Sequence, residues 1–241
     1  PQHLAKDELV GGNGLIESST FISILIGTIL GGLLIALDSI FPVAISVICI
    51  AIAGYASSRF IPKTPSASPE IKLSFNVFKA TYKNIKFLPS NKVVFLSILA
   101  ISWFWFYGSI FLMQIPNFSK KILFGDEAVV TWLLSMFSIG IGVGSLLCEK
   151  LSGKRVEIGL VPLGAIGLAI FGWDLAQSSQ AMPSHSEILN FQQFWANSGS
   201  FRILFDLAMI GVSGGLYIVP LYALVQERSD PKQLSRVIAG N

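Results

Sequence analysis

Residues 128–148 read AVVTWLLSMFSIGIGVGSLLC and carry no charged side chain, and residues 149–155 follow with EKLSGKR. A helix needs about 20 mostly apolar residues to cross a bilayer, so this stretch predicts a membrane span that ends in a charged loop. The whole chain has the same character: of its 241 residues, 52% are hydrophobic and 13% are charged, and its mean hydropathy is +0.66. A soluble domain usually carries about 25% charged residues. An ordinary water-soluble globule is therefore excluded.

Six stretches have the length and composition of a span, which predicts an all-α polytopic membrane protein. They are residues 15–37, 42–60, 93–115, 128–148, 157–176 and 203–225. The chain opens with the polar PQHLAKDE, which does not resemble a signal peptide. Cys49 and Cys148 lie within apolar stretches, so we expect two free thiols that behave as small hydrophobic side chains.

Lys and Arg are distributed unevenly between the loops on the two sides of the membrane. With a cytoplasmic N-terminus, fourteen of them fall inside, and three fall outside, namely Lys120, Lys121 and Arg202. Loops that carry an excess of Lys and Arg stay in the cytoplasm. Both ends of the chain are therefore predicted to face the cytoplasm.

Residues 62–92 are predicted to form a cytoplasmic linker between two helical bundles. The linker begins with the Pro- and Ser-rich run PKTPSASPE at 62–70, which cannot continue a helix. Residues 70–88 then place apolar side chains at helical spacing, with lysines elsewhere on the wheel, which predicts a basic amphipathic helix. This helix either lies on the inner leaflet, where it binds anionic lipids, or packs its apolar face on the bundle.

A short internal repeat indicates how the spans are grouped. Residues 8–13 read ELVGGN and residues 236–241 read RVIAGN, with all six predicted spans between them. This spacing fits a transporter built from two six-helix halves. On that interpretation, residues 1–61 are the end of the first bundle with two spans. Residues 93–241 are the start of the second bundle with four spans, and the chain is a fragment that stops before a further helix.

Three groups of small residues predict helices that approach each other closely. They are Gly27-xxx-Gly31-Gly32, Gly140-x-Gly142-x-Gly144 and Gly211-xx-Gly214-Gly215. Pro220 follows the last group and removes a backbone hydrogen bond, so we expect a kink or a flexible point there.

The loop after residue 148 carries the most specific motif in the chain. Its glycines allow close helix approach and a tight turn, and its acidic and basic groups can form charge pairs and cap helix ends. The segment resembles the loop signature of the major facilitator superfamily. The resemblance implies a twelve-helix fold, of which this chain supplies six helices, and a conformational latch in an alternating-access cycle. The alternative is an ordinary positive-inside loop. The latch residues are Gly144, Glu149, Lys150, Gly153, Lys154 and Arg155.

Residues 1–17, 140–167 and 214–241 are similar to the lysophospholipid-transporter branch of this superfamily. The likeness is strongest to the N-terminal membrane region of bacterial fusion proteins that continue into an acyltransferase and an acyl-carrier-protein ligase. It implies transport of lysophospholipid, chiefly lysophosphatidylethanolamine, across the bacterial inner membrane, with a fused acyltransferase as partner. Two other functions stay open: a carrier of small solutes or drugs, and a non-transporting anchor that presents lipid to a fused acyltransferase.

Ionisable side chains inside spans are functional candidates. Asp206 lies four residues from Arg202, which predicts an intrahelical ion pair, and Asp174 ends the fifth span. Glu17 opens the first span, either as an N-terminal acid favoured by the helix dipole or as a gate residue. The aromatic face of the third span either packs against lipid or lines a cavity for an acyl chain. The candidate substrate path comprises Glu17, Trp103, Tyr107, Gln114, Arg202, Asp206, Tyr217 and Tyr222.

Motifs for catalysis are absent from the sequence. It has no Gly-x-Ser-x-Gly, no phosphate-binding loop and no His or Cys pair at metal-ligand spacing, and its two histidines, His3 and His185, lie in polar stretches. We therefore expect no catalytic residue, no metal, no cofactor and no nucleic-acid partner.

Overall fold

The computed structural model describes residues 4–35, 37, 39–62, 91–183, 187–230 and 233–238, without the side chains of Ile35 and Arg236. Six helices in this part are long and apolar enough to cross a membrane. They are α1 (Leu9–Ile35), α2 (Ile40–Ser58), α4 (Lys92–Ile122), α5 (Glu127–Leu151), α6 (Leu160–Gln180) and α8 (Ser200–Arg228). The six predicted spans and the all-α fold class are confirmed.

The helices extend beyond the apolar stretches that predicted them. α1 begins at Leu9 rather than at residue 15, and α4 continues through Pro116 to Ile122. Two starts are fixed by side-chain caps: Asn91 accepts hydrogen bonds from two amides at the start of α4, and Asp126 accepts one from Val129. Hydropathy detects only the part of a helix that lies in hydrocarbon, so it misses these polar ends.

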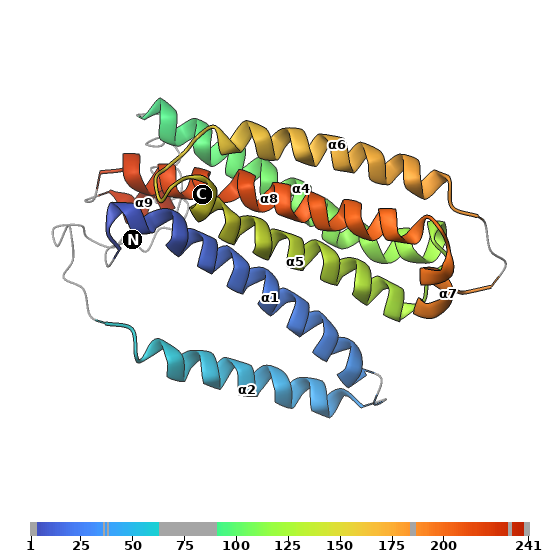
Figure 1. The fold of residues 1–241 in the computed structure, drawn as a ribbon. Helices are drawn as coiled ribbons and strands as arrows, with labels where there is room; N and C mark the ends of the chain where they lie inside the picture. Colours follow the sequence, from blue (N-terminus) through green and yellow to red (C-terminus); the bar gives the residue numbers. More distant parts are fainter. Residues whose placement is uncertain are drawn as a thin grey trace.

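The bundle is arranged around α8, with α4, α5 and α6 beside it (Figure 1). Within the most apolar window of α8, 78% of the residues are buried. α1 crosses from α5 toward α2, which has no buried residue among those described. Both chain termini lie at one end of the bundle, here called the termini end. The short helix α7 (Phe191–Ala196) lies at the opposite end, here called the α7 end.

α5 and α8 pack backbone against backbone, as their glycines predict. A Cβ placed on Gly144 would lie 2.1 Å from the carbonyl oxygen of Val212, and one on Gly140 would lie 2.1 Å from that of Ala208. In contrast, no atom of the described residues lies within 4 Å of a Cβ placed on Gly27, Gly31 or Gly32. The prediction of close packing is confirmed for the second and third glycine groups and not for the first within this part of the chain.

Other predictions have varied outcomes. Cys49 and Cys148 are free thiols, the first exposed and the second buried. The segment between α6 and α8 contains α7, which the sequence analysis did not predict, and a reciprocal capping box of Asn190 and Gln193 starts this helix. The basic amphipathic helix at 70–88 lies outside the described residues. It stays a prediction, as do the domain boundaries 1–61, 62–92 and 93–241.

Candidate functional site

Among the described residues, α1 is buried against the bundle only along its first half. Its buried residues are Leu9, Val10, Asn13, Gly14, Glu17, Ser18 and Phe21, and from Ile22 to Leu34 none is buried. Gly14 lies directly on α5, because a Cβ there would be 2.7 Å from the carbonyl oxygen of Ser145. The Ser18 hydroxyl donates to the carbonyl oxygen of Gly142 at 3.1 Å. We call this region, α1 residues 9–21 with the facing parts of α5 and α8, the α1 junction.

A pair of amides joins α1 to α8 at the junction. Asn13 Nδ2 donates to Gln226 Oε1 at 2.9 Å, and Gln226 Nε2 donates back to Asn13 Oδ1 at 2.9 Å. Asn13 Nδ2 also donates to the carbonyl oxygen of Leu9 at 2.7 Å. Hydrogen bonds of this kind hold membrane helices together where lipid gives no hydrophobic driving force.

Glu17 lies inside the junction, so the interpretation of it as an N-terminal acid of the first span is wrong, while its role as a gate residue stays a prediction. Because α1 begins at Leu9, Glu17 lies in its third turn and is 5% exposed, and its Oε2 has no hydrogen-bond partner among the described residues. One turn further along, the Phe21 ring stacks on Trp105 of α4 with 6.1 Å between centroids. Trp105 Nε1 in turn donates to the hydroxyl of Tyr222 on α8 at 2.8 Å.

The predicted latch loop contacts the first turn of α1. A Cβ on Gly11 would lie 2.8 Å from Cδ of Glu149, so this carboxylate packs against the helix start. A negative charge is favoured there by the helix dipole. The described residues show no ion pair between Glu149 and the basic residues of its own loop.

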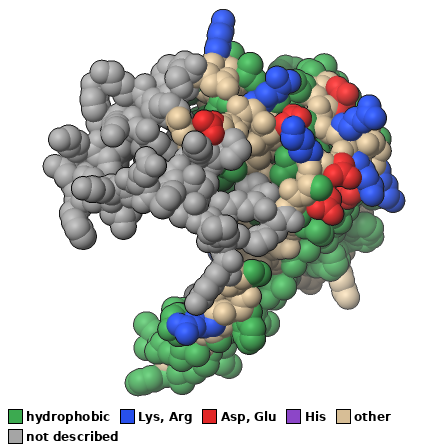
Figure 2. Space-filling view, turned by 90° about the vertical axis from the view of Figure 1, so that its left-hand side faces the viewer, with side chains coloured by type: hydrophobic (Ala, Val, Ile, Leu, Met, Phe, Trp, Pro, Cys, Tyr) green, Lys and Arg blue, Asp and Glu red, His purple; other side chains and the backbone are tan. Residues whose placement is uncertain are grey.

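The turn itself is left-handed at two positions after α5. Gly153 has φ +59°, as the sequence predicts for a tight turn, and Lys154 has φ +62°, which is uncommon for a residue with a Cβ. Lys150, Lys154 and Arg155 are exposed. Charged side chains gather on the termini end of the molecule, whose flanks are hydrophobic (Figure 2).

The aromatic run of α4 does not form one face. Trp103 stacks on Tyr107 with 5.4 Å between ring centroids, and its ring also contacts that of Tyr217 on α8 with 5.8 Å between centroids. Trp105 points instead into the α1 junction. A helix turns 100° per residue, so consecutive aromatic residues are divided between two neighbours. Gln114 is exposed and makes no contact with either group among the interactions of the described residues.

The predicted ion pair between Arg202 and Asp206 is wrong. Arg202 instead forms a bidentate pair with Asp174 of α6, with 2.8 Å between Nε and Oδ2. α6 packs beside α8 and extends past Asp174 to Gln180, which brings this carboxylate within reach. Asp206 is fully buried and accepts a hydrogen bond from Ser178 at 3.3 Å, while its Oδ1 accepts no hydrogen bond from the described residues.

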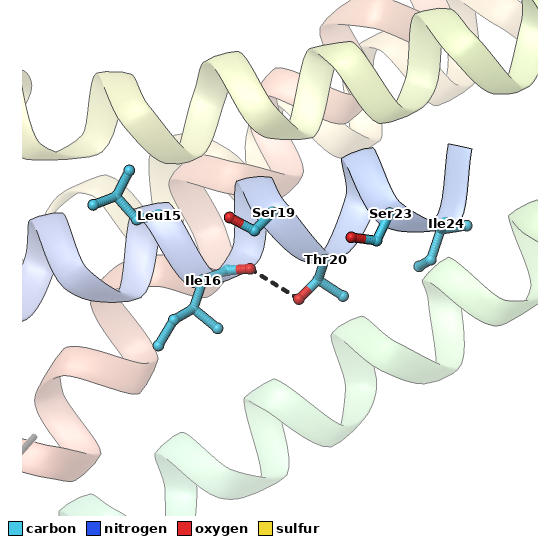
Figure 3. A pocket seen from close by; sticks show the side chains of 6 residues that line it. All are labelled: Leu15, Ile16, Ser19, Thr20, Ser23 and Ile24. Atoms are coloured by element: carbon cyan, nitrogen blue, oxygen red, sulfur yellow. Dashed lines mark hydrogen bonds between the residues drawn. The ribbon is translucent and has the colours of Figure 1, made fainter. Parts of the chain in front are cut away.

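A hollow of about 680 Å³ follows the side of α1 (Figure 3). Three hydroxyl side chains line it together with aliphatic ones, and Thr20 Oγ1 donates to the Ile16 carbonyl oxygen at 2.8 Å. The sequence analysis missed these residues, although their spacing of three and four places the hydroxyls on one side of a helix. The lining comprises Leu15, Ile16, Ser19, Thr20, Ser23 and Ile24.

The predicted path residues do not form one site, although ring contacts of Phe104 with Trp105 and Tyr217 join the first two groups. Trp103, Tyr107 and Tyr217 form one aromatic group, and Glu17 and Tyr222 belong to the α1 junction. Arg202 and Asp206 lie near the α7 end, where α8 begins.

Comparisons with known proteins agree on one family. The family model of the Major Facilitator Superfamily matches residues 2–240 of this chain. The lysophospholipid transporter LplT of Escherichia fergusonii is 31% identical over 228 residues, and that of Cronobacter sakazakii is 30% identical over 226 residues. Each alignment covers 92% of this chain and 51% of the relative, so the chain spans about half the length of the curated relatives it matches. No solved structure matches the chain significantly.

Proposed function

Because the chain belongs to the Major Facilitator Superfamily, we propose that it forms part of a secondary carrier of lysophospholipid. The carrier moves its substrate, chiefly lysophosphatidylethanolamine, across the bacterial inner membrane by alternating access. Similarity to bacterial proteins named lysophospholipid transporters, along 92% of the chain, supports the substrate class. An acyltransferase, fused as the sequence resemblance implies, would consume the delivered lipid.

The observation that carries the mechanism is the one-sided contact of α1. This helix is buried against α5 and α8 from Leu9 to Phe21 and is unburied from Ile22 to Leu34. An arrangement that is closed at one end and open at the other is one state of a rocking motion between helical bundles. The closed end is the termini end, and the opposite state requires the α1 junction to separate.

Charge distribution supports a cytoplasmic termini end. Of the ten Lys and Arg whose side chains the structure describes, seven belong to helix ends and loops at the termini end. The other three, Lys120, Lys121 and Arg202, lie near the α7 end. By the positive-inside rule the termini end faces the cytoplasm, so the closed α1 junction lies on the cytoplasmic side.

A topology experiment tests this orientation. Single cysteines at Ser66 and Ser184, in a version without Cys49 and Cys148, should react with an impermeant thiol reagent from opposite sides. Ser66→Cys should react only after the membrane is permeabilised. Equal reaction of both positions in intact cells would contradict the orientation.

The predicted latch residues hold the α1 junction in its closed state in this cycle. Glu149 stabilises the closed state through the first turn of α1, while the turn at Gly153 and Lys154 holds the loop that carries it. Exposed Lys150, Lys154 and Arg155 are free to face anionic headgroups on the cytoplasmic side.

The hollow along α1 suits a lipid with one acyl chain. Its hydroxyls at Ser19, Thr20 and Ser23 offer hydrogen bonds to a polar headgroup, and Leu15, Ile16 and Ile24 offer an apolar surface to the chain. A polar patch beside an apolar surface distinguishes such a carrier from one built around a closed aqueous pocket.

Uptake by spheroplasts that express the complete protein tests the function. Thr20→Leu should lower uptake of labelled lysophosphatidylethanolamine about tenfold, since a lost contact of about 1.4 kcal/mol has that effect. Thr28→Leu is the matched control, because Thr28 makes the same backbone hydrogen bond on α1 but does not line the hollow. Normal uptake by Thr20→Leu at equal protein level would remove the hollow from the path. Uptake of a small solute but not of the lipid would identify the alternative carrier.

A further inference from the structure

An apolar groove of about 430 Å³ lies at the α7 end of the molecule, where α7 meets α5 and the start of α8 (Figure 1). Its volume is within the range of small-ligand sites, about 300–1,000 Å³. All three helices contribute apolar or aromatic side chains, and none of the described residues that line the groove is charged. The walls include Trp132 and Met136 of α5, Phe191 and Trp195 of α7, and Phe201 and Ala208 of α8.

Aromatic contacts hold α7 in place as one wall of the groove. The Phe191 ring stacks on Trp132 of α5 with 4.7 Å between ring centroids, and it contacts the Trp195 ring with 6.0 Å between centroids. Phe194 is fully buried, and its carbonyl oxygen accepts a hydrogen bond from the Ser200 hydroxyl at the start of α8. The groove is therefore preformed rather than shaped by a ligand.

The groove is blind and lies on the side of α5 away from α1. Met136 precedes Ser145 by two and a half helical turns, so these positions lie on opposite sides of α5, and Gly14 of α1 contacts α5 at Ser145. At Ala208 the groove ends, because a Cβ on Gly140 would lie 2.1 Å from the Ala208 carbonyl oxygen, so α5 and α8 meet there backbone to backbone. A ligand can enter the groove but cannot pass through it to the α1 junction.

The depth of the groove in the membrane indicates the chemistry of its ligand. Ala208 follows Ser200, the first residue of α8, by about 12 Å along the helix axis. The lining therefore lies in the first turns of a span, where the acyl chains of a membrane lipid begin below their headgroups. Trp132 is 43% exposed and Phe201 is 66% exposed, so the groove is open to hydrocarbon at this level.

α7 itself has the composition of the boundary between membrane and water. Phe191 and Trp195 face the groove, while Gln192 and Gln193 are exposed. Tryptophan is enriched at this boundary, and amide side chains there can meet a headgroup without selecting its charge. A phospholipid with two acyl chains is the most abundant molecule that presents hydrocarbon at this depth.

We propose that the groove binds one acyl chain of a two-chain membrane phospholipid, in the leaflet at the α7 end, as a resident lipid that is not transported. The second chain lies along the exposed rings of Phe201 and Trp195, and the headgroup stays at the boundary beside α7. The bound chain stabilises the packing of α7 on α5 and α8. This site does not depend on which substrate the carrier moves.

Tryptophan fluorescence tests the site in the complete protein, purified in detergent and freed of lipid. Phosphatidylcholine with brominated acyl chains quenches a tryptophan that it contacts. Wild type should lose fluorescence saturably as this lipid is added, with a single site per protein. The saturable loss should vanish in the double variant Trp132→Phe/Trp195→Phe. It should persist in Trp173→Phe, the matched control, because Trp173 is exposed on α6 and does not line the groove.

Filling the groove should weaken binding of the brominated lipid. Ala208→Leu should lower the affinity about tenfold, since the larger side chain takes the space of about two methylene groups. Ala53→Leu, at an exposed position of α2, is the matched control and should leave the affinity unchanged. If Ala208→Leu does not fold, Phe201→Ser keeps the test, because it removes an exposed ring from the wall and should also lower the affinity.

Three outcomes would overturn the proposal. Quenching in proportion to added lipid, without saturation, would show ordinary contact between the bundle and its surroundings. No quenching of Trp132 and Trp195 would show that another part of the complete protein covers the groove. Equal displacement of the brominated lipid by lysophosphatidylethanolamine would show that a second chain contributes nothing. A complete protein that moves no lysophospholipid would contradict the proposed function, and the fluorescence result would still decide this site.

Discussion

Asn13 and Gln226 exchange two hydrogen bonds, each 2.9 Å long, although 213 positions separate them in the sequence. Each amide offers its NH₂ to the other's carbonyl oxygen, so the pair satisfies both side chains without water. It joins α1 to the end of α8 at the α1 junction. Opening of the junction must break both bonds together.

Removing either amide should destabilise the closed bundle. In a double-mutant cycle of Asn13→Leu and Gln226→Leu, the coupling should be about 1 kcal/mol, since interhelical hydrogen bonds in membranes contribute roughly 0.6 kcal/mol each. Thermal unfolding in detergent provides the measurement. Asn117→Leu, at an exposed position of α4, is the control. Strictly additive effects would show that the two side chains have no coupling energy in the stability of the bundle.

Gly11→Ala should loosen the junction, because its Cβ would displace the Glu149 carboxylate from the first turn of α1. In a background that keeps Cys148 on α5 as the single cysteine, the rate at which this buried thiol is labelled reports opening of the junction. The rate should rise about 2- to 5-fold, which corresponds to the roughly 0.3–1 kcal/mol of a charge near a helix end. Glu149→Gln should have an effect of the same sign. Gly31→Ala, with no atom of the described residues within 4 Å, is the control. If Gly31→Ala raises the rate as much, the contact with Glu149 is not the cause.

Gly144→Ala should lower the stability of the bundle by about 1–3 kcal/mol, the usual cost of overpacking. The added Cβ would lie 2.1 Å from a backbone oxygen of α8, which cannot move aside as a side-chain end can. A Cβ on Gly54 of α2 has no atom of the described residues within 4 Å, so Gly54→Ala should be neutral or stabilising, because alanine favours a helix over glycine. Melting temperatures in detergent compare the two variants. Equal melting temperatures would contradict the close packing of α5 and α8.

Arg202→Ala should couple more strongly to Asp174→Asn than to Asp206→Asn in double-mutant cycles of thermal stability. The reason is that the guanidinium pairs with Asp174 on α6, while Asp206 is buried and bonded to Ser178. The coupling should shrink as salt is added, because both partners of the ion pair are partly exposed. Rescue of Asp206→Asn by Arg202→Ala would instead support the intrahelical pair.

The sequence by itself determined the spans and several local features. Hydropathy is a property of consecutive residues, so it located all six helices, although it missed the polar ends such as residues 9–14 of α1. The glycines at 140 and 144 predicted close packing with a neighbouring helix, and Gly153 predicted the left-handed turn. Each of these depends on the chain's own local chemistry.

Only the tertiary structure decided which residues meet. Arg202 had a carboxylate four positions away, but the packing of α6 beside α8 gave it Asp174 instead. The apolar pattern placed Glu17 at the start of the first span, but the earlier start of α1 and the face that it turns toward α8 buried it beside Asn13. A lone sequence fixes the spacing of side chains along one helix, whereas partners across helices depend on the rotation and register of each helix in the bundle.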